Sequence, residues 1–478
     1  MVIVSTKYFT VKTDSGKIVC MAMGTRKRRA RQQALWIATS EVVRTPANPF
    51  YERLNEILDE WRFDQRVEAF CRRYYKGPYG QPSLPPGIYF RLLLIGYFEG
   101  LGAERAIAWR VADSLSLRKF IGYLLDEKTP DHSTISRTRR LFWLETHRAV
   151  FRWALKILEK EGLLTGQTVG VDATTLEANA ALRTIVRRDS GQPYDEFLKG
   201  LAKRDGIENP TREQLARLDR KRKKKGSNDD WTHPHDPDSR IAQMKDGSTH
   251  LAHKVEHAVD MGSGALLALT LQGADQGDTT TLTATLEEAQ EAAREANGGG
   301  IDEIVTDKGY HSDAVLDRLY LEDVRSYLPE PDRGRRCWEG KHWEQRLVYA
   351  NRQRMGGKYG RQLLRKRGEL LERSFAHMYE TGGMRRLHLR GRENILKRLV
   401  VHAAGFNLGL VMRKRFGVGK PRQAGSLISL IFAALTALRV LFGRLWDLGL
   451  QAFSLTTQES FSVVLQSVAE NWTTATGC

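Results

Sequence analysis

The chain has 478 residues, and its 75 lysines and arginines exceed its 57 acidic residues, which gives a formal charge of +18. This length allows a large hydrophobic core and more than one domain. The four cysteines form no C-x-x-C pair, which argues against a thiolate metal site or a disulfide scaffold and suits a reducing compartment. The positive charge favours a polyanionic partner, most simply nucleic acid, over an ordinary basic surface.

The N-terminal third is predicted to hold a basic arm followed by a helical domain. Residues 1–50 carry a cluster of cations at 26–31, which fits either a solvated tail or an arm on DNA. Residues 51–160 contain apolar runs of helical length, and Asp131 or Ser133 can cap a helix that follows a turn. A basic helix after a turn suits docking in the DNA major groove, although a plain helical bundle explains the same pattern. The arginines expected to contact DNA are Arg137, Arg139 and Arg140.

From about residue 165 the pattern changes to strands alternating with helices. The expected elements are strands at 168–171, 304–306 and 324–328, a hairpin of 255–259 with 265–271, and helices at 280–296 and 363–379. This alternation predicts an α/β domain over 161–420; the resemblance described below implies that its sheet is mixed and flanked by helices. A helical tail is expected over 421–478; its apolar stretch at 427–438 is short for a membrane span, which needs about 20 residues, and predicts a buried or interface helix.

A polar insert, about 175–250, separates the first expected strand from the hairpin. It contains six consecutive cations, and such a block repels itself unless a polyanion neutralises it. The cations expected to bind DNA phosphates are Arg220, Lys221, Arg222, Lys223, Lys224 and Lys225.

Three acidic residues occupy settings typical of a metal site. Asp172 and Asp307 each follow an apolar run and are therefore expected at strand ends, and Glu372 lies in a later helical stretch. Glu369, one helical turn earlier, competes with Glu372, which is preferred because core-forming residues flank it. Each aspartate taken alone fits a turn or cap residue, and only the joint pattern favours a shared site.

The chemistry of such a site follows from its charges. Residues at the carboxyl ends of strands project into the crevice where α/β proteins bind ligands. Three carboxylates there repel one another without cations, and Mg²⁺ suits oxygen ligands of this kind. A pair of divalent metals cuts and joins phosphodiesters by in-line displacement. Lys308, next to the second aspartate, and Arg365, on the side of Glu372, are placed to neutralise a phosphate.

Some local patterns leave alternatives open. Gly309 is expected either to take a positive φ or to admit a phosphate where a Cβ would clash, and Tyr310 either packs against the sheet or stacks on a base. The histidines at 250, 253 and 257 invite a zinc interpretation, but a strand would not place all three on one face.

Five segments resemble parts of the bacterial insertion-sequence DDE transposases, namely their three active-site blocks, the segment after the glutamate and the helical N-terminal domain. In that order they are Val171–Ala180, Asp307–His311, Glu372–His377, Arg385–Asn394 and residues 80–145. The resemblance extends over about 50–420. It implies an RNase H-like catalytic fold with Asp172, Asp307 and Glu372 as ligands of two Mg²⁺ ions, for which Mn²⁺ can substitute.

The resemblance also implies an activity and partners. The enzyme would free a 3′-OH at the end of an insertion sequence and join it to target DNA. Its partners would be double-stranded DNA, as terminal inverted repeats and target, and further copies of the chain in a homo-oligomer. It would work without a membrane, in the bacterial cytoplasm at the nucleoid.

One departure from the family's pattern concerns a DNA contact. Many relatives carry a lysine one or two turns after the glutamate, where this chain has Met378 and Tyr379, so that contact would pass to Arg373 or Arg385. Two rival interpretations stay open. One is a metal-dependent nuclease without strand transfer, and the other is a DNA-binding regulator whose carboxylates are structural.

Overall fold

The computed structural model describes most of the chain, namely residues 21–22, 48–75, 81–222, 226–244, 247–423 and 438. The chain divides into two compact units, Met1–Val411 and Met412–Cys478. The expected basic arm and the expected helical tail lie almost entirely outside the described residues.

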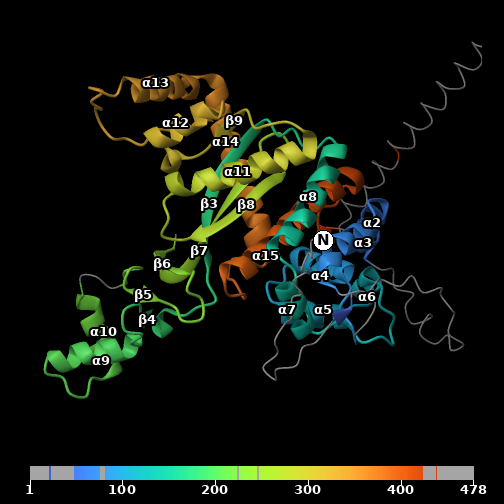
Figure 1. Ribbon diagram of the computed structural model, residues 1–478, viewed down its shortest axis with the longest axis horizontal. Coiled ribbons are helices and arrows are strands. Elements are labelled where there is room, and N and C mark those ends of the chain that lie inside the picture. The colour runs from blue at the N-terminus through green and yellow to red at the C-terminus, as the bar shows by residue number, and fades with distance from the viewer. Residues whose placement is uncertain are drawn as a thin grey trace, which may run out of the picture. The chain divides into compact units, whose positions relative to one another are not determined.

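The region after residue 48 is helical, as expected. Its elements are α2 (Pro49–Glu60), α3 (Phe63–Cys71), η1 (Arg72–Tyr74), α4 (Pro86–Glu99), α5 (Glu104–Ala112), α6 (Leu115–Ile121), α7 (His132–Leu141) and α8 (Leu144–Lys160) (Figure 1). A two-residue strand β1 (Met21–Ala22) pairs with β2 (Gln81–Pro82). Helix α4 is buried over almost its whole length; Pro86 starts it and Gly100, with a φ of 72°, ends it. Arg91 inside this core is neutralised by Asp64 at 3.1 Å.

A mixed sheet follows. Its strands are β3 (Thr168–Glu177), β6 (Arg240–Gln243), β7 (Thr249–Asp260), β8 (Leu266–Gly273), β9 (Glu303–Val305) and β10 (Arg325–Tyr327). The order is β10–β9–β3–β7, and both β6 and β8 pair with β7. β3 runs parallel to β9 and antiparallel to β7. The first strand thus lies between its own hairpin and the later parallel strands, which is the RNase H-like arrangement.

Helices cover both faces of this sheet. The helical elements that follow β8 along the chain are α11 (Asp278–Asn297), η3 (Lys308–Tyr310), α12 (Asp313–Leu321), α13 (His342–Gly356), α14 (Lys358–Phe375), the π-helical turn η4 (Ala376–Glu380), α15 (Arg392–Phe416) and the short η5 (Pro421–Gln423). On β7, Glu256 bonds to Thr285 of α11, whereas its neighbour His257 bonds to Ser374 of α14. Because successive side chains on a strand point to opposite faces, α11 and α14 lie on opposite sides of the sheet.

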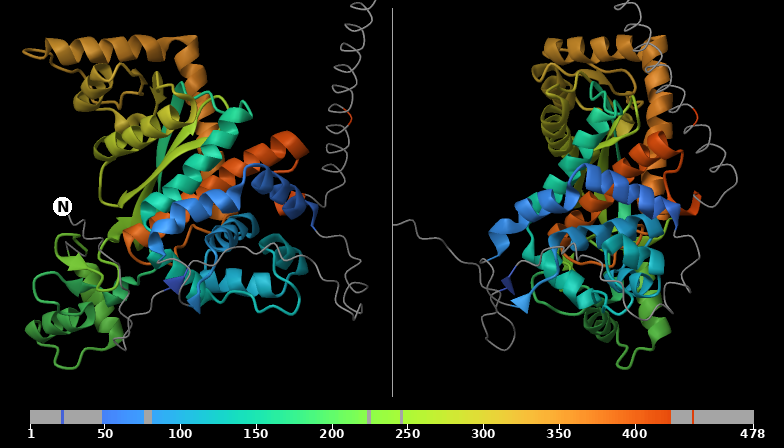
Figure 2. Two further views of the ribbon diagram at one scale, coloured as in Figure 1. Left: turned by 45° about the vertical axis from the view of Figure 1, so that its right-hand side comes forward. Right: turned by 90° about the vertical axis from the view of Figure 1, so that its right-hand side faces the viewer.

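Helix α15 links the helical region to the sheet (Figure 2). Asn407 hydrogen-bonds both backbone groups of Leu266 on β8, and Gly405 lies against the Tyr97 ring of α4. By length and composition α15 is the one described helix that could cross a membrane, but 94% of its most apolar window is buried inside the protein, as in a core helix.

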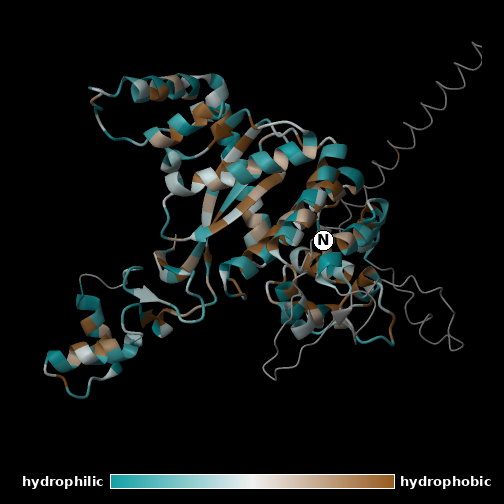
Figure 3. Cartoon of the chain, viewed as in Figure 1, coloured by the Kyte–Doolittle hydropathy of each residue, from teal (hydrophilic) through white to brown (hydrophobic). Residues whose placement is uncertain are grey.

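The insert is folded, with small cores of its own. Its elements are η2 (Leu182–Thr184), β4 (Val186–Arg187), α9 (Tyr194–Arg204), α10 (Arg212–Lys221) and β5 (Trp231–Thr232). Trp231 and Ile185 are buried in one cluster, and Leu198 and Leu215 in a second between the two helices. The helices of the insert carry hydrophobic positions among hydrophilic ones (Figure 3). The insert is therefore a small structured module rather than a loop.

Candidate active site

Asp172 lies on β3 and not at its end. The strand was expected to stop at residue 171, but β3 continues to Glu177 because β7 is long enough to pair with it from Val169 to that residue. What ends near Asp172 is the pairing with β9, whose last pair is Gly170 with Val305. The side chain of Asp172 is 27% exposed, so it remains accessible from one edge.

Asp307 directly follows β9 and caps the short helix η3. Its carboxylate accepts a hydrogen bond from the Gly309 amide at 2.8 Å. Continuing the register of Gly170 with Val305 by two residues brings Asp307 level with Asp172. The two carboxylates interact electrostatically, and Asp307 is one of the groups that raise the pKa of Asp172. The structure thus brings the two aspartates together.

Helix α14 carries the third acidic candidate across the same face. Gly170 makes room for it, because a Cβ there would come within 3.2 Å of Arg367 and 3.4 Å of Leu371. Glu369 and Glu372 are both exposed, and about 100° of rotation per residue turns both away from the face that Arg367 and Leu371 bury. Glu369 is bound to Arg373 at 2.5 Å, which leaves Glu372 as the better placed of the two.

Glu372 itself is exposed and does not meet the aspartates in this arrangement. In the part of the chain that the structure describes, no three acidic, histidine or cysteine side chains lie close enough to hold a metal ion. Arg367 provides the counter-charge that Asp172 has here, at 2.9 Å. Burial raises the pKa of Asp172, the Arg367 guanidinium and the Ala173 amide oppose that rise, and the pKa stays above its ordinary value.

Sequence reasoning did not single out Arg367. It stands four residues before Leu371, so the helical repeat alone places the two on one face, and a charged residue on a core-facing stripe is the signal that could have found it. Arg365 and Arg373 point outward, and Lys308 is exposed beside Asp307. Among these cations, Lys308 is next to Asp307 in sequence, and Arg373 is bound to Glu369.

A network of buried polar side chains lies near the aspartates, on the face of the sheet that α11 covers. Glu256 is fully buried and accepts hydrogen bonds from Thr285 at 2.6 Å and from Tyr310 at 3.2 Å. Lys254 lies 3.3 Å from Glu256 and 2.6 Å from Asp278, which neutralises both acids. Tyr310 therefore packs within the domain instead of stacking on a base. A glutamate and a lysine within an apolar strand are the sequence signal of such a network.

Gly309 is needed for a close approach and not for a positive φ. Its φ lies outside the left-handed region, so the first of the two expected reasons for a glycine is wrong. A Cβ on Gly309 would lie 2.5 Å from an Asp278 oxygen and 3.1 Å from an Asp307 oxygen. The group that comes close to Gly309 is thus the Asp278 carboxylate rather than a phosphate, because helix α11 begins beside η3.

The arginines of α7 divide into two kinds. Asp131 caps the helix by accepting from the Ser133 amide, and Arg137 and Arg140 are exposed on one side of it. Arg139 was expected to contact DNA as well, but it is 7% exposed, forms an ion pair with Glu104 and donates to Asn394 at 3.2 Å. Its guanidinium is held within the protein, so Arg139 is a structural residue.

Of the basic run of the insert, some side chains are exposed to solvent and one is bound within the insert. Arg220 and Lys221 are exposed at the end of α10, and Lys223, Lys224 and Lys225 lie outside the described residues. Arg222 is bound to Asp219 at 3.1 Å and lies over the Phe197 ring. It contributes to the insert's own fold, which the sequence pattern of six consecutive cations did not indicate.

The histidines of β7 hold other elements in place. His257, opposite Asp172 in the strand pairing, donates from Nδ1 to Ser374, whose hydroxyl in turn donates to the Leu371 carbonyl. Its Nε2 accepts from Tyr379 in the π-helical turn, and burial lowers the pKa of His257 to about 3, which keeps it neutral. Tyr379 stands at one of the two positions where the family resemblance led us to expect a lysine. It is buried, and its bond to His257 fixes the end of the helix that carries Glu372 against β7.

His253 binds the insert instead of a metal. Its Nε2 lies 3.1 Å from the buried carboxylate of Asp236, which also accepts from the Gly391 amide at 3.0 Å. His250, on the other face, is half exposed and lies 3.8 Å from Glu177. The zinc interpretation of these histidines gains no support among the described residues.

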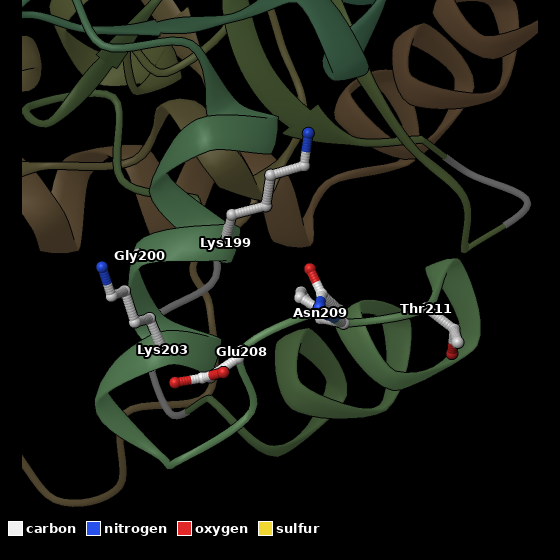
Figure 4. A pocket seen from close by; sticks show the side chains of 7 residues that line it. Lys199, Gly200, Lys203, Glu208, Asn209 and Thr211 are labelled. Carbon is white, nitrogen blue, oxygen red and sulfur yellow. The ribbon is translucent and has the colours of Figure 1, made fainter.

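Two cavities lie away from the aspartates. One of about 440 Å³ lies within the insert and is lined by Lys199 and Lys203 of α9 and by residues 208–211, which lead into α10 (Figure 4). The other, of about 690 Å³, lies at the far end of β3 and is bordered by the insert and by Arg386 and Arg390. Neither cavity has Asp172, Asp307 or Glu372 among its lining residues.

Two family models match the chain. The first, a transposase domain (DUF772), covers residues 41–141, and the second, a transposase DDE domain, covers residues 226–408. Comparisons with curated proteins and with solved structures gave no significant match. The second match includes Asp307 and Glu372 but begins after Asp172, whose place in the site depends on its position beside Asp307. With the mixed sheet and its flanking helices, these matches identify the chain as a member of the insertion-sequence DDE transposases.

Proposed function

We propose that this transposase cuts DNA at the ends of its own insertion sequence and joins the freed 3′-OH to target DNA. The observation that carries the proposal is the placement of Asp172 on β3 level with Asp307, which directly follows the neighbouring strand β9, in a chain that belongs to this family. Terminal inverted repeats and target DNA are the proposed substrates, and a homo-oligomer assembled on DNA in the cytoplasm is the proposed working form.

Asp172, Asp307 and Glu372 are the proposed ligands of two divalent metal ions. Their chemistry fits, because all three offer carboxylate oxygens, the ligands that Mg²⁺ prefers, and the two aspartates already lie side by side. Bound divalent metals would stabilise the attacking and leaving oxygens of an in-line displacement at phosphorus. Mg²⁺ is the proposed ion, with Mn²⁺ able to substitute.

The surrounding residues have proposed roles of their own. Lys308 and Arg365 are exposed near the carboxylates and would neutralise phosphates of bound DNA. Arg373 forms an ion pair with Glu369, and Arg385 forms one with Glu380 at 2.6 Å. Each arginine would have to leave its carboxylate partner to bind a phosphate of DNA. Arg220 and Lys221 would bind phosphates without reading sequence.

The test uses the full-length protein, a plasmid that carries the gene with its flanking DNA, a second target plasmid, and Mg²⁺. Cleavage at both ends of the element with joined products in the target supports the proposal. Cleavage without joined products would replace it with a nuclease, and binding without cleavage would replace it with a regulator. Asp307→Asn protein in the same reaction excludes a contaminating nuclease.

A further inference from the structure

A segment after the π-helical turn is attached to the end of β3. The Glu177 amide donates to the Arg385 carbonyl at 3.1 Å, and the Leu387 amide donates to the Glu177 carbonyl at 2.9 Å. Asn179 continues the attachment, because its side-chain amide donates to the His388 carbonyl at 3.1 Å. The segment is therefore held as an extra extended piece beside the strand that carries Asp172.

This attachment fixes which side chains face outward. Leu387 is buried, and the alternation of an extended chain then leaves Arg386, His388 and Arg390 exposed. Arg390 is held in addition by a hydrogen bond from its Nε to the Asn179 carbonyl at 2.9 Å. The remaining guanidinium nitrogens of Arg390 point into the space next to β3.

That space is the cavity of about 690 Å³. Parts of the chain far apart in sequence border it: the end of β3, the insert, the start of β7 and the attached segment. Its cationic and imidazole side chains are Arg183, Arg386, Arg390, His233, His235 and His250. Glu177 is the single carboxylate among the lining residues, and it lies 3.4 Å from Arg386. Three arginines against one carboxylate make the cavity suited to an anion.

The cavity lies at the end of the strand that carries Asp172. Glu177 is five residues beyond Asp172 on β3, which corresponds to about 17 Å at 3.3–3.4 Å per residue. Arg385 lies between them, with its guanidinium 3.1 Å from the Thr174 hydroxyl. Arginines thus accompany β3 from Asp172, where Arg367 lies, to the cavity. Phosphates of one DNA strand advance about 3.4 Å each along the helix axis, so 17 Å corresponds to about five phosphates.

We infer that this cavity is a binding site for the DNA sugar-phosphate backbone, about five phosphates from the bond that is cut, with Arg386 and Arg390 as its anionic contacts. The inference rests on the proposed function only for the position of the scissile bond. It gives the insert a second role in DNA binding besides that of its basic run, because His233 and His235 of the insert also line this cavity. It also explains why the segment after the glutamate is attached to β3.

The first experiment measures phosphate contacts without cleavage. Binding of a fluorescein-labelled 40-base-pair duplex of arbitrary sequence is followed by anisotropy at several salt concentrations, without divalent metal. The double variant Arg386→Gln/Arg390→Gln is expected to lower the log–log salt slope by about 1.8 units, since each phosphate contact contributes about 0.9. Arg386→Gln alone, which leaves the hydrogen bond to Asn179 intact, should lower it by about 0.9, and Arg386→Lys should restore it.

The matched control is Arg294→Gln/Arg325→Gln, which removes the same charge from exposed residues of α11 and β10. An equal fall in slope for this pair would mean that net charge alone matters and would overturn the site. So would an unchanged slope in Arg386→Gln protein that melts as the wild type does. If the wild type failed to cleave but the salt slopes of the variants fell as expected, the proposed function would be refuted and the phosphate contacts of this cavity would stand.

The second experiment tests the position. Single neutral methylphosphonate linkages are placed along a fragment that carries the element's end. The wild type should bind least well when the neutral linkage lies about five phosphates from the cleaved bond, and the double variant should not distinguish that position. A wild-type minimum elsewhere would refute the geometry even if the slopes behave as expected.

Discussion

At the scale of single residues, the two aspartates and the glutamate differ in what surrounds them. Arg367 neutralises Asp172, while Glu372 stays on the exposed flank of α14. Three carboxylates in close contact would repel one another, which explains why only two are brought together here.

The first prediction distinguishes the two glutamates of α14. Glu372→Gln should lower cleavage by at least about 100-fold, because even outer-shell partners of metal ligands are worth about 10–100-fold. Glu369→Gln is the matched control and should cleave normally, since Glu369 is 65% exposed and binds only Arg373 among the described residues. Single-turnover cleavage of end DNA decides between them. Activity abolished in the control and kept in Glu372→Gln would reverse the assignment.

The second prediction concerns Gly309. In Gly309→Val the added Cβ meets Oδ2 of Asp278, whose other carboxylate oxygen lies 2.6 Å from Lys254, so either this carboxylate or the turn that holds Asp307 must shift. Cleavage should fall by about 10-fold or more, while the free energy of unfolding should fall by less than about 1.5 kcal/mol. Gly300→Val is the control, because a Cβ there meets nothing within 4 Å. If Gly309→Val abolished cooperative melting, Gly309 would be a folding residue.

At the scale of elements, buried neutral histidines hold helices in place. His257 holds α14 and the π-helical turn against β7. His147 on α8 does the same in the helical region: its Nδ1–H donates to the Trp143 carbonyl at 2.9 Å, so its Nε2 accepts from Tyr89 at 3.0 Å. Burial lowers the pKa of His147 to about 3. Both residues act only while uncharged.

The third prediction follows from that pKa. An unfolded histidine titrates near 6.5, so His147 contributes stability that is present above about pH 6.5 and is lost as the pH falls toward about 3. In His147→Gln the slope of unfolding free energy against pH over this range should be shallower by up to about 1.4 kcal/mol per pH unit. Urea titrations at several pH values measure it. His342→Gln, on the exposed start of α13, should keep the wild-type slope.

At the scale of the first unit, the helical region and the sheet are joined through α8, α11 and α15. Arg148 and Arg152 of α8 form ion pairs with Glu288 and Glu295 of α11 at 3.0 and 2.9 Å. Arg139 reaches Asn394, which lies 255 residues away in sequence. DNA bound by α7 would therefore be held in a defined relation to the aspartates, which end recognition requires.

The fourth prediction concerns that recognition. Arg137→Gln/Arg140→Gln in the full-length protein should reduce the preference for the element's end over scrambled DNA, by about 5- to 150-fold for each base that the variant no longer reads. Both side chains are exposed on α7, and helices of this kind read bases from the major groove. Arg66→Gln/Arg105→Gln, also exposed, is the control pair. Competition binding gives the preference, and an undiminished one would place sequence reading elsewhere.

Local patterns were enough to predict much of this protein. The helix α11 between Gly277 and Gly298, the β7–β8 hairpin and the cap of α7 by Asp131 depend on neighbouring residues, so periodicity and turn chemistry indicate them. The order of two aspartates after apolar runs and a helical glutamate likewise pointed to the family that the comparisons confirm.

Tertiary structure alone decided the rest, because those features depend on partners distant in sequence. β3 extends past Asp172 because β7 pairs with it, and no local signal reveals the length of a partner strand. Arg139 is buried because Glu104 and Asn394 meet there, although Arg137 and Arg140 on the same helix are exposed. The charge of a residue can be read from the sequence, but whether protein or DNA neutralises that charge is settled only by what folds against it.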